Sequence, residues 1–166
     1  RSRPITRLYD ANGNLIIRPL TYDYPWVIDD PDYKNEYYLG DMLVAPILKK
    51  KDTLINRTIH RVYLPEGIWY DFITGKKFPG DKQYISFYRD EDYPLFIKRG
   101  GIVPLNNNKD LNDTSNPKSL EIHIFPGESN TFDLYEDKDD GSNDNLFTQI
   151  DYNYLPSNYT VIIRTL

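Results

Sequence analysis

Four acidic residues lie close to aromatic residues and have side chains that could cleave a glycosidic bond: Asp41, Asp71, Glu91 and Asp92. A retaining glycosidase places two carboxyl groups about 5–5.5 Å apart across that bond, and an inverting enzyme places them further apart. The spacing of these four residues defines no such pair. Asp41 lies between a glycine and an apolar run, and Asp71 alternates with aromatic residues, as structural and surface acids do. We therefore assign none of them as catalytic.

Other residue types that carry chemistry are scarce. The chain has no Cys and 2 His, which excludes thiolate nucleophiles and disulfides and leaves few ligands for zinc. His60 and His123 lie in predicted strands, outside any recognisable nucleophile setting. We interpret both as hydrogen-bonded or solvent-facing residues, and we expect no cofactor and no metal site.

The acidic stretch EDKDDGSNDN, Glu136 to Asn145, has carboxylates spaced as in a calcium-binding loop. An EF-hand loop has its glycine at position 6 and ends with a glutamate. Counted from Asp137, Gly141 falls one place too early, and no glutamate closes the loop. The pattern favours a solvated hairpin turn rich in Asp, Asn and Gly.

The charge distribution limits the possible partners. Lys and Arg number 20 against 25 Asp and Glu, a net charge of −5, and the basic residues are scattered apart from Leu48 to Lys51. Nucleic acid is excluded because phosphate binding needs a clustered basic face. A membrane partner is not expected, since no apolar run approaches ~18 residues and the first ten lack a signal peptide's apolar block. Three Asn-X-Ser/Thr triplets, at 56–58, 112–114 and 158–160, are interpreted as chance matches, so the compartment, cytoplasmic or secretory, stays open.

Short strands separated by turn signals are predicted to position these residues, because no sustained helical periodicity occurs. Residues 14–20 predict a buried strand that enters a loop, within a first segment too rich in Tyr, Asp and Pro for long regular elements. Residues 41–48 are nearly continuously apolar, which predicts burial on both faces. Residues 57–65 and 66–75 predict an antiparallel pair, because Pro-Glu-Gly suits a tight turn between them.

The second half of the chain continues this pattern. Residues 84–88 predict another strand, and Gly100 and Gly101 separate two apolar runs, which indicates a bulge or a turn with positive φ. The polar, Asn-rich stretch 106–118 predicts a loop or linker.

Three strands are predicted beyond that loop. Residues 120–125 and 131–137 alternate apolar and polar residues, and we predict a hairpin with PGESN as its turn. Residues 159–166 predict a last strand.

Four motifs occur in a fixed order: YLGDMLVAPIL (38–48), RVYLPEGIWYDFITGKKFPG (61–80), PLFIKRGGIVPL (94–105) and DLYEDKDDG (133–141). In sequence and separation they closely resemble the carboxy-terminal part of glycoside hydrolase family 31. The earlier stretch 14–25 resembles the last barrel strand of that family and its exit, so the resemblance covers nearly the whole chain.

The resemblance implies a mainly β fold. We expect an antiparallel β-sandwich, the proximal carboxy-terminal domain, preceded by the last strand and exit of a β/α barrel and followed by a second, incomplete β-sandwich. It divides the chain into the barrel end with a connecting segment (1–38), the proximal sandwich with a linker (39–118) and the start of a distal sandwich (119–166).

The resemblance also implies a function. Members of the family are mostly retaining α-glucosidases and α-xylosidases, with some transglycosylases and lyases, and their catalytic aspartates lie on earlier barrel strands. Matching motifs are absent here, since Leu39 to Asp41 leads directly into the sandwich. The parent enzyme would bind its oligosaccharide in the barrel, while this chain, inactive alone, would brace that barrel as an intramolecular partner. Trp69, Tyr70 and Phe72 would pack the sandwich core and the barrel interface.

Two alternatives stay open. One is a free-standing carbohydrate-binding β-sandwich with Trp26, Tyr84 and Tyr88 as stacking platforms, and the other is a structural fragment of a multichain assembly. The glycone, the linkage and the oligomeric state are not predicted.

Overall fold

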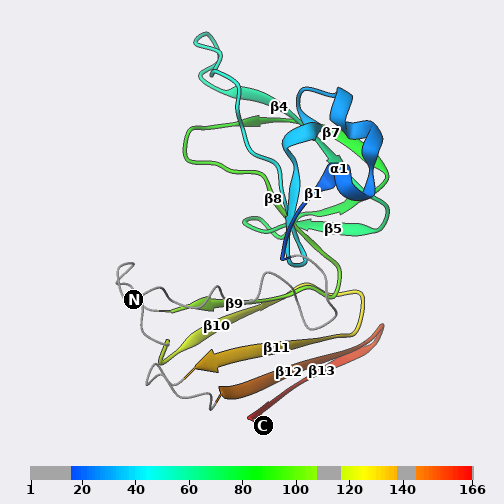
Figure 1. Cartoon of the computed structure of the whole chain (residues 1–166), viewed down its shortest axis with the longest axis vertical. Helices are drawn as coiled ribbons and strands as arrows, with labels where there is room; N and C mark the ends of the chain where they lie inside the picture. The colour runs from blue at the N-terminus through cyan, green and yellow to red at the C-terminus, as the bar shows by residue number, and fades with distance from the viewer. Residues whose placement is uncertain (1–15, 108–116, 138–144, 166) are drawn as a thin grey trace. The chain divides into compact units, whose positions relative to one another are not determined.

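The computed structural model in Figure 1 describes residues 16–107, 117–137 and 145–165. These residues form mainly antiparallel β-sheets with almost no helix, which confirms the predicted fold class at this level. The chain divides into two compact units, Arg1–Lys98 and Arg99–Leu166. Within the described ranges, no helix is both long and apolar enough to cross a membrane.

The first unit begins with short elements. They are β1 (Ile17–Pro19), α1 (Leu20–Asp23), the 3-10 helices η1 (Pro25–Asp29) and η2 (Tyr33–Asn35), β2 (Tyr37–Leu39) and β3 (Met42–Val44). Frequent prolines keep them short, because proline donates no backbone hydrogen bond. The amide of Leu20 donates to the carbonyl of Glu36 at 2.8 Å, which ties the two ends of this segment together.

A six-stranded sheet in the order β1-β2-β3-β8-β5-β6 forms the centre of the first unit. Its other strands are β5 (Ile68–Asp71), β6 (Lys77–Pro79) and β8 (Leu95–Lys98). Leu43 of β3 lies opposite Phe96 of β8, and both are buried. The predicted burial of residues 41–48 on both faces is only partial, because Met42 and Val44 are half-buried.

The predicted pairing of residues 57–65 with 66–75 is wrong. β4 (Thr58–Leu64) pairs with β7 (Lys82–Tyr88), while β5 pairs with β6 and β8. The backbone groups of the intervening turn bond elsewhere: the carbonyl of Pro65 accepts the indole N–H of Trp69 at 2.7 Å, and the carbonyl of Gly67 accepts the amide of Gly80 at 2.7 Å. With φ of 127° at Gly67, the chain passes from one sheet to the other at this turn.

The core of the first unit contains side chains from both sheets and from the short helices. They are Leu20, Val27, Tyr33, Leu43, Ala45, Val62, Tyr63, Leu64, Trp69 and Phe96. Trp69 is fully buried, whereas Tyr70 and Phe72 are half-buried. Trp69 therefore packs in the core, as the resemblance implies, whereas Tyr70 and Phe72 are not among its buried residues.

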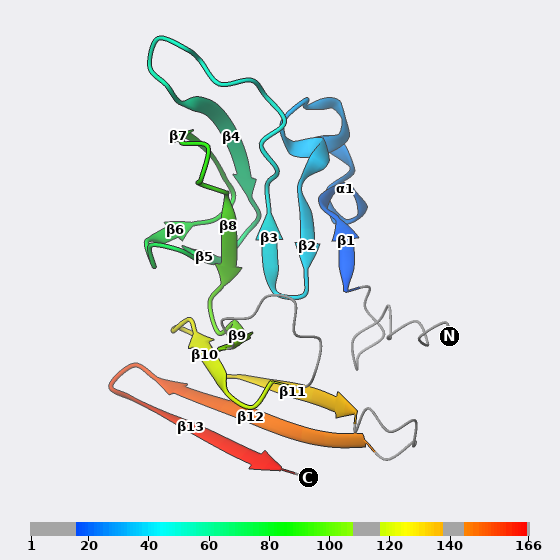
Figure 2. The same ribbon diagram turned by 90° about the vertical axis from the view of Figure 1, so that its left-hand side faces the viewer.

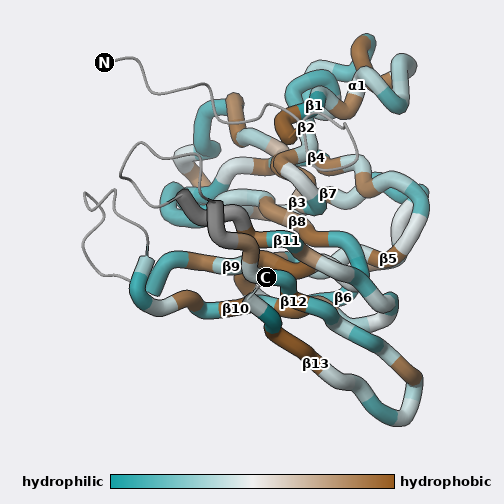
Figure 3. Tube along the Cα trace, turned by 60° about the horizontal axis from the view of Figure 1, so that its bottom comes forward, coloured by the Kyte–Doolittle hydropathy of each residue, from teal (hydrophilic) through white to brown (hydrophobic). Residues whose placement is uncertain are grey.

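The described residues of the second unit form five strands, β9 (Ile102–Asn106), β10 (Leu120–Ile124), β11 (Asn130–Asp137), β12 (Asn145–Leu155) and β13 (Asn158–Thr165). Hydrophobic and hydrophilic residues alternate along several of them (Figure 3). Its core contains Ile102, Ile150 and Tyr152. β13 confirms the predicted last strand.

The predicted hairpin between residues 120–125 and 131–137 is also wrong. β10 pairs with β9, and β11 pairs with β12. Phe125 extends the β9–β10 pairing, since its amide donates to Gly101 at 3.0 Å and its carbonyl accepts the amide of Gly100 at 2.7 Å. Gly100 has φ of 79°, which confirms the predicted turn. Asp137 lies opposite Asn145, and residues 138–144 of the predicted acidic turn lie outside the described residues.

Candidate functional site

A cluster of four charged residues, the Asp32 cluster, lies where the first connecting segment meets β4. The nearly buried carboxylate of Asp32 accepts hydrogen bonds from Arg61 Nε at 2.9 Å and from Lys49 Nζ at 2.6 Å. Arg61 Nη2 also donates to Asp30 Oδ2 at 2.9 Å. Although burial raises it, the pKa of Asp32 is held below its usual value by the hydrogen bonds from Lys49 and Arg61. The cluster is an internally neutralised ion-pair network.

Glu36 is a buried acid without a cationic partner. It is 1% exposed, and Oε1 accepts the amide of Tyr63 at 2.9 Å, while Oε2 has no hydrogen-bond partner among the described residues. Burial raises the pKa of Glu36 to about 9, against the lowering effect of the Tyr63 amide. The side chain is therefore a neutral carboxylic acid at neutral pH.

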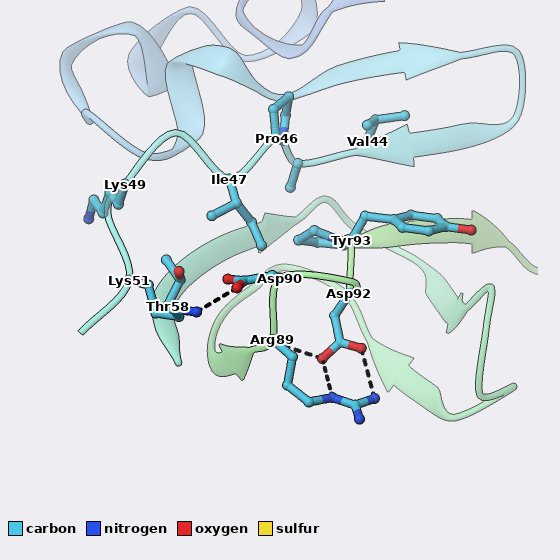
Figure 4. A pocket seen from close by; sticks show the side chains of 12 residues that line it. Val44, Pro46, Ile47, Lys49, Lys51, Thr58, Arg89, Asp90, Asp92 and Tyr93 are labelled. Carbon is cyan, nitrogen blue, oxygen red and sulfur yellow. Dashed lines mark hydrogen bonds and ion pairs between the residues drawn. The ribbon is translucent and has the colours of Figure 1, made fainter. Parts of the chain in front are cut away.

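A pocket with a volume of about 390 Å³ lies between the end of β3 and the turn after β7 (Figure 4). Four of its charged lining residues form two pairs, and Lys49 and Thr58 also line it. Lys51 Nζ contacts Asp90 Oδ2 at 2.5 Å, and Arg89 donates to both oxygens of Asp92 at 3.1 and 3.2 Å. The ring of Tyr93 adds an exposed aromatic surface.

Two of the four candidate acids belong to this turn. Asp92 accepts the backbone amide of Arg89 at 2.9 Å as well as its guanidinium, and Glu91 contacts the same guanidinium at 3.0 Å. Hydrogen bonds from the side chain and backbone of Arg89 hold the pKa of Asp92 below its usual value. A carboxylate with a lowered pKa is a poor proton donor. The ion pair between Asp92 and Arg89 therefore closes a turn, and Asp92 lacks the properties of a glycosidase acid.

The other two candidate acids lie in separate turns. Asp71 Oδ1 accepts the amides of Ile73 at 3.1 Å and Thr74 at 2.7 Å and the hydroxyl of Thr74 at 2.7 Å. Asp41 is exposed between β2 and β3, and its carbonyl accepts the amide of Lys98 at 3.4 Å. Of the four candidates, Asp92 alone lines the pocket.

The histidines are not brought together with any of these acids. His60 is buried on β4, with its ring 6.2 Å from that of Tyr88, and burial lowers its pKa. His123 Nε2 lies 3.0 Å from Glu121 Oε1 on β10. Within the described ranges, no three His, Cys, Asp or Glu side chains are grouped to hold a metal ion.

The three candidate stacking platforms differ in exposure. The hydroxyl of Tyr84 donates to the carbonyl of Pro79 at 2.5 Å, and its ring packs edge-on against Phe78. Tyr88 is half-buried beside His60, whereas Trp26 is 50% exposed. Only Trp26 therefore presents a large free ring surface among the three.

Comparison with known proteins gives the family. A model of the glycosyl hydrolase family 31 C-terminal domain matches residues 13–103, more than half of the chain. The chain belongs to glycosyl hydrolase family 31. This confirms the resemblance that the four motifs indicate.

Relatives of this family 31 chain are much longer proteins. The 1,6-alpha-glucosyltransferase of Sporosarcina globispora is 30% identical over 89% of the chain and 11% of its own length, and the alpha-xylosidase of Saccharolobus solfataricus is 30% identical over 90% and 19%. The cycloalternan-forming enzyme of Listeria monocytogenes superimposes with a TM-score of 0.69 at 26% identity, over 90% of the chain and 14% of that structure. The chain thus spans less than a fifth of the length of these relatives.

In this family 31 chain, sequence reasoning missed two groups of buried acids, Glu36 and the Asp32 cluster. The available signal was the high density of acids between Asp29 and Glu36 beside tyrosines. Their partners Arg61 and Tyr63 lie more than 25 residues away in the sequence, so the pattern alone does not distinguish a buried acid from a solvated one.

Proposed function

We propose that this chain is the carboxy-terminal β-domain region of a retaining α-glycosidase that acts on α-glucosides or α-xylosides. In this role it braces the catalytic barrel and supplies neither the nucleophile nor the acid/base. The observation that carries the proposal is the match of residues 13–103 to the family 31 C-terminal domain. Relatives named glucosyltransferase and xylosidase support the substrate class.

The contacts of the candidate acids support a non-catalytic role. Asp71 caps a turn, and Asp92 is paired with Arg89 on both oxygens. Retaining hydrolysis needs one free carboxylate as nucleophile and a second carboxyl group that can donate a proton. The nucleophile and the proton donor would therefore lie in the barrel, which would also bind the oligosaccharide.

The proposed architecture follows the predicted division. Residues 1–38 would complete the barrel and connect it, residues 39–118 would form the proximal sandwich with its linker, and residues 119–166 would begin the distal sandwich. Support for a sandwich comes from the first unit, where Val62 and Leu64 of the β4–β7 pair share one core with Trp69 and Phe96 of the six-stranded sheet.

An activity assay tests the proposal. The 166-residue chain is expected to release no nitrophenol from p-nitrophenyl α-glucoside or α-xyloside above buffer between about pH 4 and 8. The Asp41→Asn and Asp71→Asn variants serve as controls. Turnover by the wild-type chain that either substitution abolishes would contradict the proposal.

A carbohydrate-binding module is the second candidate function, and the half-exposed ring of Trp26 favours it. Isothermal titration calorimetry of the chain with maltose and xylose oligosaccharides distinguishes a bracing domain from a carbohydrate-binding module. Binding at millimolar or lower concentration that is lost in Trp26→Ala supports the module.

A further inference from the structure

The pocket in Figure 4 has two walls of different character, and both belong to the first unit. The apolar wall is the segment from Val44 to Ile47 at the end of β3, and the charged wall is the turn between β7 and β8, which contributes Arg89, Asp90 and Asp92. Figure 2 shows β3 beside β8, with β7 leading into β8 through that turn. At about 390 Å³, the pocket lies near the lower end of the range for small-molecule sites.

Backbone hydrogen bonds hold both walls in place. The amide of Ala45 in the apolar wall donates to the carbonyl of Pro94 at 3.1 Å, which ties this wall to the chain that follows the charged wall. In the charged wall, the amide of Asp92 donates to the carbonyl of Arg89 at 3.1 Å, and the amide of Arg89 donates to Asp92 Oδ2 at 2.9 Å. A ligand therefore meets a pocket that is already formed, so little conformational entropy is lost on binding.

Each of the three cations that line the pocket has an acidic partner. The pairs are Lys51 with Asp90, Arg89 with Asp92, and Lys49 with Asp32. An anionic ligand would have to compete with these carboxylates for the cations, and it would be repelled by them. A neutral ligand meets neither obstacle, so the charge balance of the pocket favours a neutral ligand.

The ion pair of Lys51 and Asp90 keeps hydrogen-bonding capacity for such a ligand. An ammonium group has three donors and a carboxylate has about four acceptor sites. The contact between Lys51 Nζ and Asp90 Oδ2 uses one of each, and the Asp90 side chain is 70% exposed. A donor and an acceptor side by side suit a hydroxyl group, which both donates and accepts. A ligand rich in hydroxyl groups therefore matches this pair.

Tyr93 gives the pocket a flat apolar surface next to these polar groups. Its side chain is 56% exposed and lines the pocket beside Pro94. A pyranose sugar has ring faces of C–H groups and edges of hydroxyl groups, and a tyrosine ring packs against such a face through dispersion. An aromatic ring next to paired donors and acceptors is therefore the combination that a sugar ring needs.

We propose that this pocket is a second, non-catalytic binding site for a neutral oligosaccharide, an inference that rests on the proposed function. Tyr93 covers one face of a pyranose ring, and Lys51 and Asp90 form hydrogen bonds with its hydroxyl groups. Because the substrate of the parent enzyme is itself a neutral oligosaccharide, the site holds a substrate chain on the enzyme independently of the barrel and raises the local concentration of substrate. The site is distinct from Trp26, which does not line this pocket.

Calorimetry of the full-length enzyme tests the inference. The probe is a maltotriose with sulfur-linked glucose units, because thioglycosidic bonds resist hydrolysis. We expect the wild type to bind one molecule of this probe more than Tyr93→Ala does, and we expect Lys51→Ala to weaken this extra site at least roughly tenfold. Tyr93→Phe keeps the ring and should retain the site. The matched control is Tyr159→Ala, at a tyrosine that is 67% exposed outside the pocket, and it should bind the probe as the wild type does.

Two results would overturn the inference. One is an equal number of bound probe molecules in the wild type and in Tyr93→Ala, with both proteins folded by thermal unfolding. The other is binding of inorganic phosphate that depends on Lys51 and that the probe does not displace, which would make the pocket an anion site.

Hydrolysis of p-nitrophenyl α-glucoside and α-xyloside by the same wild-type preparation tests the proposed function separately. An enzyme that hydrolyses neither compound but has the site that depends on Tyr93 refutes only the proposed function. An enzyme that hydrolyses either compound but lacks that site refutes only this inference.

Discussion

Asp32 and Glu36 lie four residues apart in one connecting segment, and both are almost completely buried, at 3% and 1% exposed. Asp32 meets two cationic side chains and stays ionised, while Glu36 meets a single backbone amide and becomes neutral. Their pKa values accordingly move in opposite directions, below the usual value for Asp32 and to about 9 for Glu36. At equal burial, the partner determines the charge state.

Replacing Glu36 by a side chain that cannot ionise should change the free energy of unfolding more than any other substitution predicted here. Because the pKa of about 9 in the folded state lies above the ordinary 4.5, the folded state binds more protons between these values, and stability falls as pH rises through this window. Glu36→Gln should remove this loss, at up to about 1.4 kcal/mol per pH unit. Urea unfolding at several pH values should show equal stabilities near the acid end and an increasing advantage of the variant toward the alkaline end.

The control for this experiment is Glu66→Gln, at an exposed glutamate of the same unit. It should show no comparable growth of the difference with pH. A Glu36→Gln variant that is equally destabilised at all pH values would mean that Glu36 is needed as a carboxylate, and the contrast with Asp32 would fail.

Removing the cation from the Asp32 cluster should have the next largest effect. Arg61→Leu leaves the buried carboxylate of Asp32 with Lys49 alone and removes the contact to Asp30. Breaking a buried ion pair on one side costs about 3–5 kcal/mol. The free energy of unfolding, measured by chemical denaturation at neutral pH, should fall toward the lower end of that range because Arg61 is partly exposed.

Arg99→Leu is the matched control for Arg61→Leu. Arg99 Nε pairs with Glu128 Oε2 at 2.9 Å, and both side chains are exposed. An exposed pair contributes about 0–1 kcal/mol. Equal losses in the two variants would contradict the view that Asp32 depends on its cations.

His60 should produce a smaller, opposite dependence on pH. Burial lowers its pKa below the ordinary 6.5, so the unfolded state binds more protons just below that value, and stability falls as pH falls through it. His60→Phe keeps an aromatic ring on β4 but cannot be protonated. Its unfolding free energy should therefore lose less than the wild type does on going from neutral to acidic pH. If both proteins lose stability in parallel, the buried imidazole is not responsible for the acid limb.

Local pattern predicted much of this fold. The turn at Gly100 and the strands themselves follow from residue type and period. The core position of Trp69 follows from the family resemblance. Pairing partners did not follow at two turns, because β4 pairs with β7 and the Phe125 backbone bonds to Gly100 and Gly101, all outside the predicted hairpins. Glu36 was missed for the same reason, since its burial depends on Tyr63, 27 residues away. Long-range contacts decide what local sequence leaves open.

Asp71 extends the comparison to a half-buried acid whose hydrogen bonds lie at the surface, where the smallest effect on stability is expected. Its Oδ1 accepts three short-range hydrogen bonds in the turn after β5, from two amides and one hydroxyl. Asp71→Ala leaves these donors to water, which satisfies them at this exposed site, so the cost should be about 1 kcal/mol. Asp71→Asn keeps the side-chain oxygen and should cost less, because acceptance by that oxygen and not charge holds the turn. Thermal unfolding of the two variants distinguishes the contribution of the hydrogen-bond acceptor from that of the charge. If Asp71→Asn were as destabilising as Arg61→Leu, the charge of Asp71 would matter as it does for Asp32, and exposure would no longer separate the two acids.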